Sequence, residues 1–93
     1  ADRPPLAEPL VSSLRRFLAS AERAASLVVL KTSPGYASVI AVELDRLPPA
    51  GVVGTVAGDD TIFIATRSEE SAAGLTALFR EVAGITPKAR PLV

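Results

Sequence analysis

The stretch "VVGTVAGDDTIFIATR", residues 52–67, decides the fold because it contains two strand-forming runs separated by a tight turn. Its first six and last seven residues are rich in Val, Ile, Thr and Phe, which favour β-strands. The sequence "GDD" joins these runs, and Gly58 is expected to supply the backbone conformation that other residues avoid. The pattern therefore predicts a β-hairpin with Asp59 and Asp60 at its tip.

One helix is predicted before this hairpin in the sequence and one after it. The segment "SPGYASVIAVELDRL" (33–47) has apolar residues at helical spacing, and Ser33 is its expected N-cap. The segment "SEESAAGLTALFREVAG" (68–84) is expected to be capped by Ser68 and ended by Gly84. The predicted buried stripe of the first helix consists of Ala37, Ile40, Ala41, Leu44 and Leu47.

The remaining segments complete a small α+β domain. The run "LVVLKT" (27–32) predicts a buried strand, and the preceding segment 13–26 has helical spacing and favours a helix by propensity alone. Residues 1–12 contain three prolines and predict a linker or frayed end, as does the tail 86–93. We therefore expect one domain over 13–93, with two helices on one face of a mostly antiparallel sheet.

The composition excludes several kinds of chemistry. The chain of 93 residues has ten basic and ten acidic residues, so clustered positive charge for nucleic acid or membrane binding is not expected. It contains no Cys and no His, which removes thiolate chemistry, the imidazole base and the usual zinc ligands. No signal peptide or membrane span is visible, and a cytoplasmic location is expected.

The adjacent carboxylates of Asp59 and Asp60 are the most informative polar feature. A turn needs at most one Asp, and a second ionised neighbour adds repulsion, so a cation is expected beside the pair. An ordinary polar turn is the simplest alternative. The pair could also hold Mg²⁺ in a phosphoryl-transfer enzyme, although that reaction asks for further carboxylates and a basic groove. A trimerisation module without any ligand is the third possibility.

A second face of the helix at 33–47 is a candidate surface for contact with a ligand or another subunit. Val39 and Val42 lie away from the buried stripe. They are either isolated exposed valines, which are common, or part of a subunit contact. Ser38 and Asp45 lie two turns apart on nearly the same side. A polar group that meets this face could therefore touch both side chains.

Three motifs resemble the C-terminal domain of the bacterial arginine repressor. They are "LVVLKTSPGYA", "ELDRL" and "GTVAGDDTIF", and the resemblance covers about residues 14–84. It implies a β-β-α-β-β-α fold in which 17–22 is the first strand, with 10–16 left as a short helix. It also implies a transcriptional regulator of arginine metabolism rather than an enzyme. Its homotrimers pair into a homohexamer with the corepressor L-arginine between them, and no metal or other cofactor is implied. The family's N-terminal winged-helix domain, which reads operator DNA, is absent from this sequence.

Carried over position by position, the resemblance implies ligand contacts at Asp59, Asp60, Asp45, Thr55 and Ala57. Ser38 is the sixth candidate, and it stands where relatives often carry glutamine, so a contact there could be lost or passed to water. A guanidinium group suits the acidic pair because its planar fork of five N–H donors is accepted by carboxylates two at a time. Asp45 could instead be a solvated residue near a helix end, and Thr55 and Ala57 could simply be strand residues.

Overall fold

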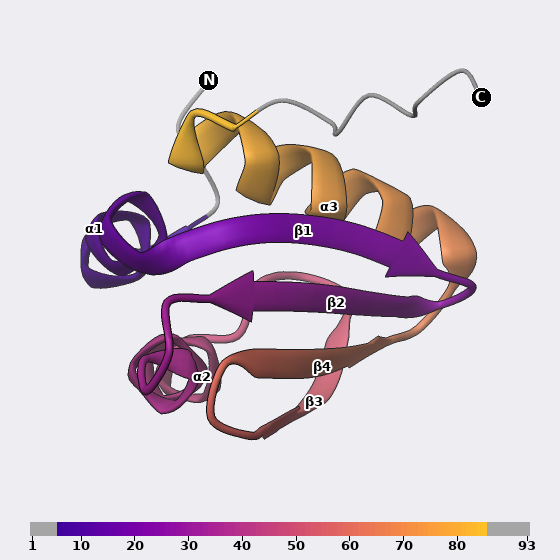
Figure 1. Ribbon diagram of the computed structural model, residues 1–93. Helices are drawn as coiled ribbons and strands as arrows, with labels where there is room; N and C mark the ends of the chain where they lie inside the picture. The colour runs from indigo at the N-terminus through magenta and orange to yellow at the C-terminus, as the bar shows by residue number, and fades with distance from the viewer. Residues whose placement is uncertain (1–5, 86–93) are drawn as a thin grey trace, which may run out of the picture.

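The structure is a computed structural model that describes residues 6–85 and contains a four-stranded sheet and three helices (Figure 1). The elements are α1 (Glu8–Phe17), β1 (Leu18–Ala24), β2 (Leu27–Thr32), α2 (Ala37–Arg46), β3 (Val52–Ala57), β4 (Thr61–Thr66) and α3 (Glu69–Ala83). The expected α+β class and the β-β-α-β-β-α order are confirmed, and α1 is added in front of them. The tail 86–93 and residues 1–5 lie outside the described residues.

The sheet has the strand order β1-β2-β4-β3, and all neighbouring strands are antiparallel. Successive strand residues point to opposite faces, so the register divides each strand into a buried set and an outer set. Val28 is paired with Ile64, and both are fully buried against the helices. Phe63 is paired with Val29 on one side and Val56 on the other, and this row lies on the opposite, open face.

All three helices contribute to one hydrophobic core on the closed face of the sheet. Helix α1 packs against both α2 and α3 and lies between them (Figure 1). The largest fully buried side chains are Phe79, Leu10, Leu14, Leu30, Ile40, Leu44, Ile62, Ile64 and Val28. Within residues 6–85, every helix is too short or too polar to cross a lipid bilayer.

The N-terminal segment differs from the linker expected over residues 1–12. Helix α1 begins at Glu8, and the side chains of Leu6 and Leu10 are buried in the core. Pro9 lies in the first turn, where its missing N–H removes no intrahelical hydrogen bond. The described part of the domain therefore starts at residue 6, and prolines alone were a poor guide to its boundary.

The strand at 17–22 implied by the family resemblance is confirmed, because β1 runs over Leu18–Ala24. It turns into β2 at Ala25, which has a φ of 56°. The helical propensity of this region is overridden by pairing with β2. The segment 13–26 therefore divides into the end of α1 and an edge strand.

Three local expectations for α2 and the hairpin are wrong. Helix α2 begins at Ala37, and Tyr36 is at its N-cap position with no side-chain cap, so Ser33 does not cap it. Leu47 lies beyond the helix and is 61% exposed, so it does not extend the buried stripe. Gly58 is not among the glycines with positive φ, which are Gly35, Gly51 and Gly84. The hairpin closes instead with the N–H of Gly58 donating to the carbonyl of Thr61 at 2.8 Å.

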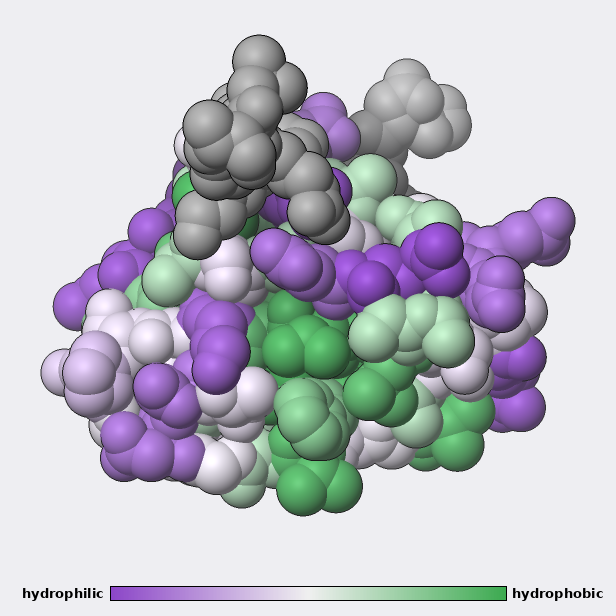
Figure 2. All heavy atoms as spheres, turned by 45° about the vertical axis from the view of Figure 1, so that its right-hand side comes forward, coloured by the Kyte–Doolittle hydropathy of each residue, from purple (hydrophilic) through white to green (hydrophobic). Residues whose placement is uncertain are grey.

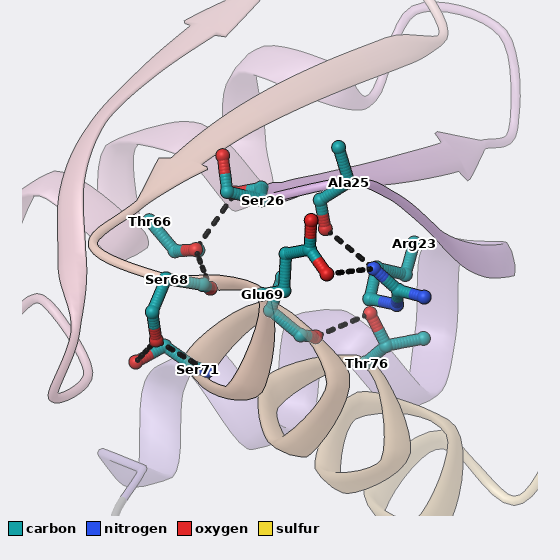
Figure 3. A network of polar contacts seen from close by, with 9 residues as sticks. Arg23, Ala25, Ser26, Thr66, Ser68, Glu69, Ser71 and Thr76 are labelled. Atoms are coloured by element: carbon teal, nitrogen blue, oxygen red, sulfur yellow. Dashed lines mark hydrogen bonds and ion pairs between the residues drawn. The ribbon is translucent and has the colours of Figure 1, made fainter.

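Helix α3 has the predicted ends. The hydroxyl of Ser68 accepts the N–H of Ser71 at 3.0 Å, and Gly84 adopts the left-handed conformation after the last turn. Figure 3 shows the polar contacts around this N-terminus, where the hydroxyl of Thr66 lies 2.7 Å from the carbonyl of Ser26. These contacts fasten the start of α3 to the turn between β1 and β2.

Candidate ligand-binding site

The tip of the β3–β4 hairpin is fastened to the loop that precedes α2. The carboxylate of Asp59 accepts the N–H of Gly35 at 3.2 Å, and its carbonyl accepts the N–H of Ala37 at 3.1 Å. The carbonyl of Asp60 accepts the N–H of Thr32 at 2.9 Å. The tip therefore has a defined position against the first turn of α2 and does not extend freely from the domain.

This arrangement explains why α2 does not need Ser33 as a cap. The first N–H groups of a helix have no partner inside the helix, and here the carbonyl of Asp59 accepts the one at Ala37. The positive end of the helix dipole also favours carboxylates close by. The hairpin thus caps the helix, and the first turn of the helix in turn fixes the backbone of Asp59.

Both acidic side chains at the tip are exposed to solvent. A surface hollow of about 320 Å³ adjoins them, at the small end of the volumes typical of small-molecule sites. It is lined by Val56, Gly58, Asp59, Asp60, Thr61 and Phe63. A ligand there would meet carboxylates on one side and apolar side chains on the other.

Asp45 and Thr55 form a second polar group at the opposite end of α2. The hydroxyl of Thr55 donates to the carboxylate of Asp45 at 2.9 Å, and this bond joins the helix to β3. Ser38 and Asp45 are seven residues apart, which corresponds to about 10 Å along a helix.

Thr55 and Ala57 present backbone groups at the open edge of the sheet. The closing hydrogen bond joins Gly58 to Thr61, and hydrogen-bonded pairs alternate along an antiparallel ladder. Thr55 and Ala57 therefore fall in non-hydrogen-bonded pairs, with their N–H and C=O groups directed away from β4. Because β3 is an edge strand, these groups are available to a ligand or a neighbouring chain.

Ser38 is exposed in the first turn of α2 and makes no hydrogen bond to the other predicted residues among residues 6–85. It shares one helix face with Val42 and Asp45, at spacings of four and seven residues. The structure therefore brings Asp45 and Thr55 into contact and places Asp59 and Asp60 together, with Ser38 on the helix face between the two groups.

Sequence reasoning missed Lys31 and Thr61, which support the acidic tip. The ammonium group of Lys31 donates to the hydroxyl of Thr61, and that hydroxyl donates to Asp60. Lys31 also borders a larger hollow of about 390 Å³ over β1 and β2, which contains none of the predicted ligand residues. In the part of the chain that the structure describes, no three His, Cys, Asp or Glu side chains gather closely enough to hold a metal ion.

Comparison with known families identifies the domain. The family model described as "Arginine repressor, C-terminal domain" matches residues 14–81. The chain is similar to the arginine repressor of Thermotoga petrophila, with 48% identity over 73 residues, covering 75% of this chain and 48% of the relative. It is also similar to the arginine repressor of Thermus thermophilus, with 44% identity over 85 residues, covering 91% of this chain and 50% of the relative.

A third relative, the arginine repressor of an Anaeromyxobacter species, is 43% identical over 79 residues, covering 85% of this chain and 49% of the relative. The chain thus spans about half the length of the curated relatives it matches. These relatives are named as repressors, not as enzymes. Together with the observed β-β-α-β-β-α order, the match shows that the chain belongs to the family of arginine repressor C-terminal domains.

Proposed function

We propose that this chain is the effector-binding and oligomerisation domain of an arginine-dependent transcriptional repressor of arginine metabolism. L-Arginine is the corepressor, bound between subunits, and it stabilises a hexamer made of two trimers. Operator DNA is contacted by a separate winged-helix domain, and the protein acts in the cytoplasm. The observation that carries the proposal is the exposed pair Asp59 and Asp60, held at a defined position beside an apolar hollow.

The chemistry of arginine matches the two polar groups of the site. A guanidinium group offers its donors in a planar fork, and two adjacent carboxylates can accept that fork from different directions. The α-ammonium group needs an acceptor, for which Asp45 is exposed at the other end of α2. The α-carboxylate needs donors, and the outward N–H groups of Thr55 and Ala57 supply that chemistry.

The surface of a single protomer supports the subunit contact. Val56 is 72% exposed and Phe63 is 48% exposed on the open face of the sheet, and Val42 on α2 is 52% exposed. Figure 2 shows a broad hydrophobic area on one side of the molecule, bordered by hydrophilic residues. Exposed apolar surface of this kind is typical of interaction sites. Arginine that fills a site completed by a neighbour would link ligand concentration to assembly.

Isothermal titration calorimetry with three ligands tests the proposal. L-Arginine should release or absorb heat without added metal, and L-lysine should bind far more weakly, because a point charge does not fill a planar fork. Heat that depends on Mg²⁺ would instead support phosphoryl-transfer chemistry at Asp59 and Asp60. No heat with any ligand would leave a trimerisation module that binds no amino acid.

A further inference from the structure

Lys31 and Thr61 face each other across neighbouring strands. They are directly opposite in the register of β2 and β4, and the ammonium nitrogen of Lys31 lies 2.9 Å from the hydroxyl of Thr61. The same hydroxyl lies 2.9 Å from Oδ1 of Asp60. One threonine hydroxyl therefore lies between a cation and one of the two acids at the hairpin tip.

The chemistry of the groups sets the direction of both hydrogen bonds. A lysine ammonium group can only donate, so the oxygen of Thr61 accepts from Lys31. The single hydroxyl proton of Thr61 is then directed to Asp60. Because its acceptor is ionised, this second bond is charge-assisted and stronger than one between neutral groups.

Asp60 is held by two hydrogen bonds, one at its backbone and one at its side chain. Its carbonyl accepts the N–H of Thr32 at 2.9 Å, which fixes the backbone. Its Oδ1 accepts the hydroxyl of Thr61, which fixes the rotation of the carboxylate. Among residues 6–85, the one side-chain hydrogen bond to Asp60 engages Oδ1, which leaves Oδ2 for a ligand, and Asp60 lines the hollow beside the tip.

We infer that Lys31 and Thr61 are positioning residues for ligand recognition, and that they act through Asp60. This inference rests on the proposed arginine site. A planar fork needs a carboxylate whose plane is already aligned, and the relay from Lys31 through Thr61 supplies that alignment before the ligand arrives. Neither residue needs to touch arginine itself.

The test is calorimetric titration of the 93-residue chain with L-arginine. Thr61→Val keeps the branched shape of the side chain and removes the hydroxyl, so it should weaken binding about tenfold, at the upper end of the cost of ordering one side chain when a ligand binds. Thr61→Ser restores the hydroxyl and removes a methyl group, and it should bind within about threefold of the original chain. This pair separates the hydrogen bond from packing, because loss of packing alone would weaken Thr61→Ser more.

Lys31 is tested in the same way. Lys31→Met should weaken arginine binding, and Lys31→Arg should restore it, because arginine also donates to a hydroxyl. Arg67→Met is the matched control for the loss of one positive charge, since Arg67 is exposed beyond the far end of β4. Thermal unfolding of each variant shows whether the fold is retained.

The outcomes separate the relay from the proposed function. Arginine binding by the unchanged chain, with equal affinity in Thr61→Val, would overturn the relay and leave the proposed function intact. Weaker binding in Thr61→Ser than in Thr61→Val would also overturn it, because packing would then be the cause. Absence of arginine binding by the unchanged chain would overturn both.

Discussion

At the hairpin tip, two adjacent carboxylates are tolerated because each has its own donor. Asp59 accepts a backbone N–H from Gly35, and Asp60 accepts the hydroxyl of Thr61. The two side chains are therefore held by different elements, the loop before α2 and strand β4. This division reduces the freedom of both groups and leaves them exposed on the same surface.

Asp60→Asn is the residue-scale test of ligand recognition. In the proposed site, replacing the carboxylate by an amide removes the charge that would face a guanidinium group, and arginine binding should weaken by roughly 2–5 kcal/mol. Glu81→Gln, which removes an exposed carboxylate near the end of α3, is the matched control and should leave the affinity unchanged. A titration of Asp60→Asn that matches the unchanged chain would exclude Asp60 from the site.

The backbone conformation of Gly51 contributes to the stability of the fold. It has a φ of 89°, and an added Cβ would lie 2.9 Å from the hydroxyl oxygen of Ser71. Gly51→Ala should therefore lower the free energy of unfolding by about 1–3 kcal/mol. Gly74→Ala is the control, because this position lies inside α3 with open space around it. This substitution should raise the free energy of unfolding by about 0.5–1 kcal/mol. Chemical denaturation would measure both, and equal effects would contradict the argument.

Among the secondary-structure elements, α1 runs over Glu8–Phe17 and is longer than the short helix expected at 10–16. Its buried face consists of Leu10 and Leu14, which are one turn apart and fill the space between α2 and α3. The side chain of Arg15 donates to the carbonyl of Val82 at 3.1 Å, which adds a polar contact to α3. The helix is therefore part of the domain core.

Leu14→Ala tests this role of α1. Leu14 is 0% exposed, so truncation should lower the free energy of unfolding by about 2–5 kcal/mol. Leu47→Ala makes the same chemical change at an exposed position and should alter stability by less than about 0.5 kcal/mol. If both variants unfolded at the same denaturant concentration, α1 would not be packed as described.

The elements that sequence predicted well are those fixed by local patterns. The strands of the hairpin follow from their β-branched residues, and α3 follows from Ser68 and Gly84 at its ends. The start of α2 failed because its cap comes from Asp59, which is remote in sequence from the helix it caps. In the same way, Gly35 and the carboxylate of Asp59 are 24 positions apart. Such a partner is visible only once the strands are paired.

In the candidate site too, some features follow from the local sequence and others only from the packing of distant segments. Asp59 and Asp60 are noticeable in the sequence because adjacent acids at a turn are unusual, and the helix period placed Ser38 and Asp45 on one side. The contact between Lys31 and Thr61 could not be predicted, because it depends on β2 lying next to β4 and on their register. The hydrogen bond between Asp45 and Thr55 likewise depends on the packing of α2 against β3.

For the whole molecule, the main feature is a sheet with one covered and one open face. Three helices bury one face, and the row Val29, Phe63 and Val56 crosses the other. The acidic tip adjoins this row, because Val56 and Phe63 also line the hollow beside Asp60. An interface over the open face and a ligand at the tip would therefore affect each other directly.

Sedimentation velocity of the 93-residue chain at low protein concentration, with and without L-arginine, shows whether arginine links the subunits. A ligand that fills a site shared between subunits must favour the assembled state. We predict that trimers shift to hexamers as arginine is added, and that L-lysine at the same concentration produces no such shift. A chain that sediments as a monomer both with and without arginine would contradict it.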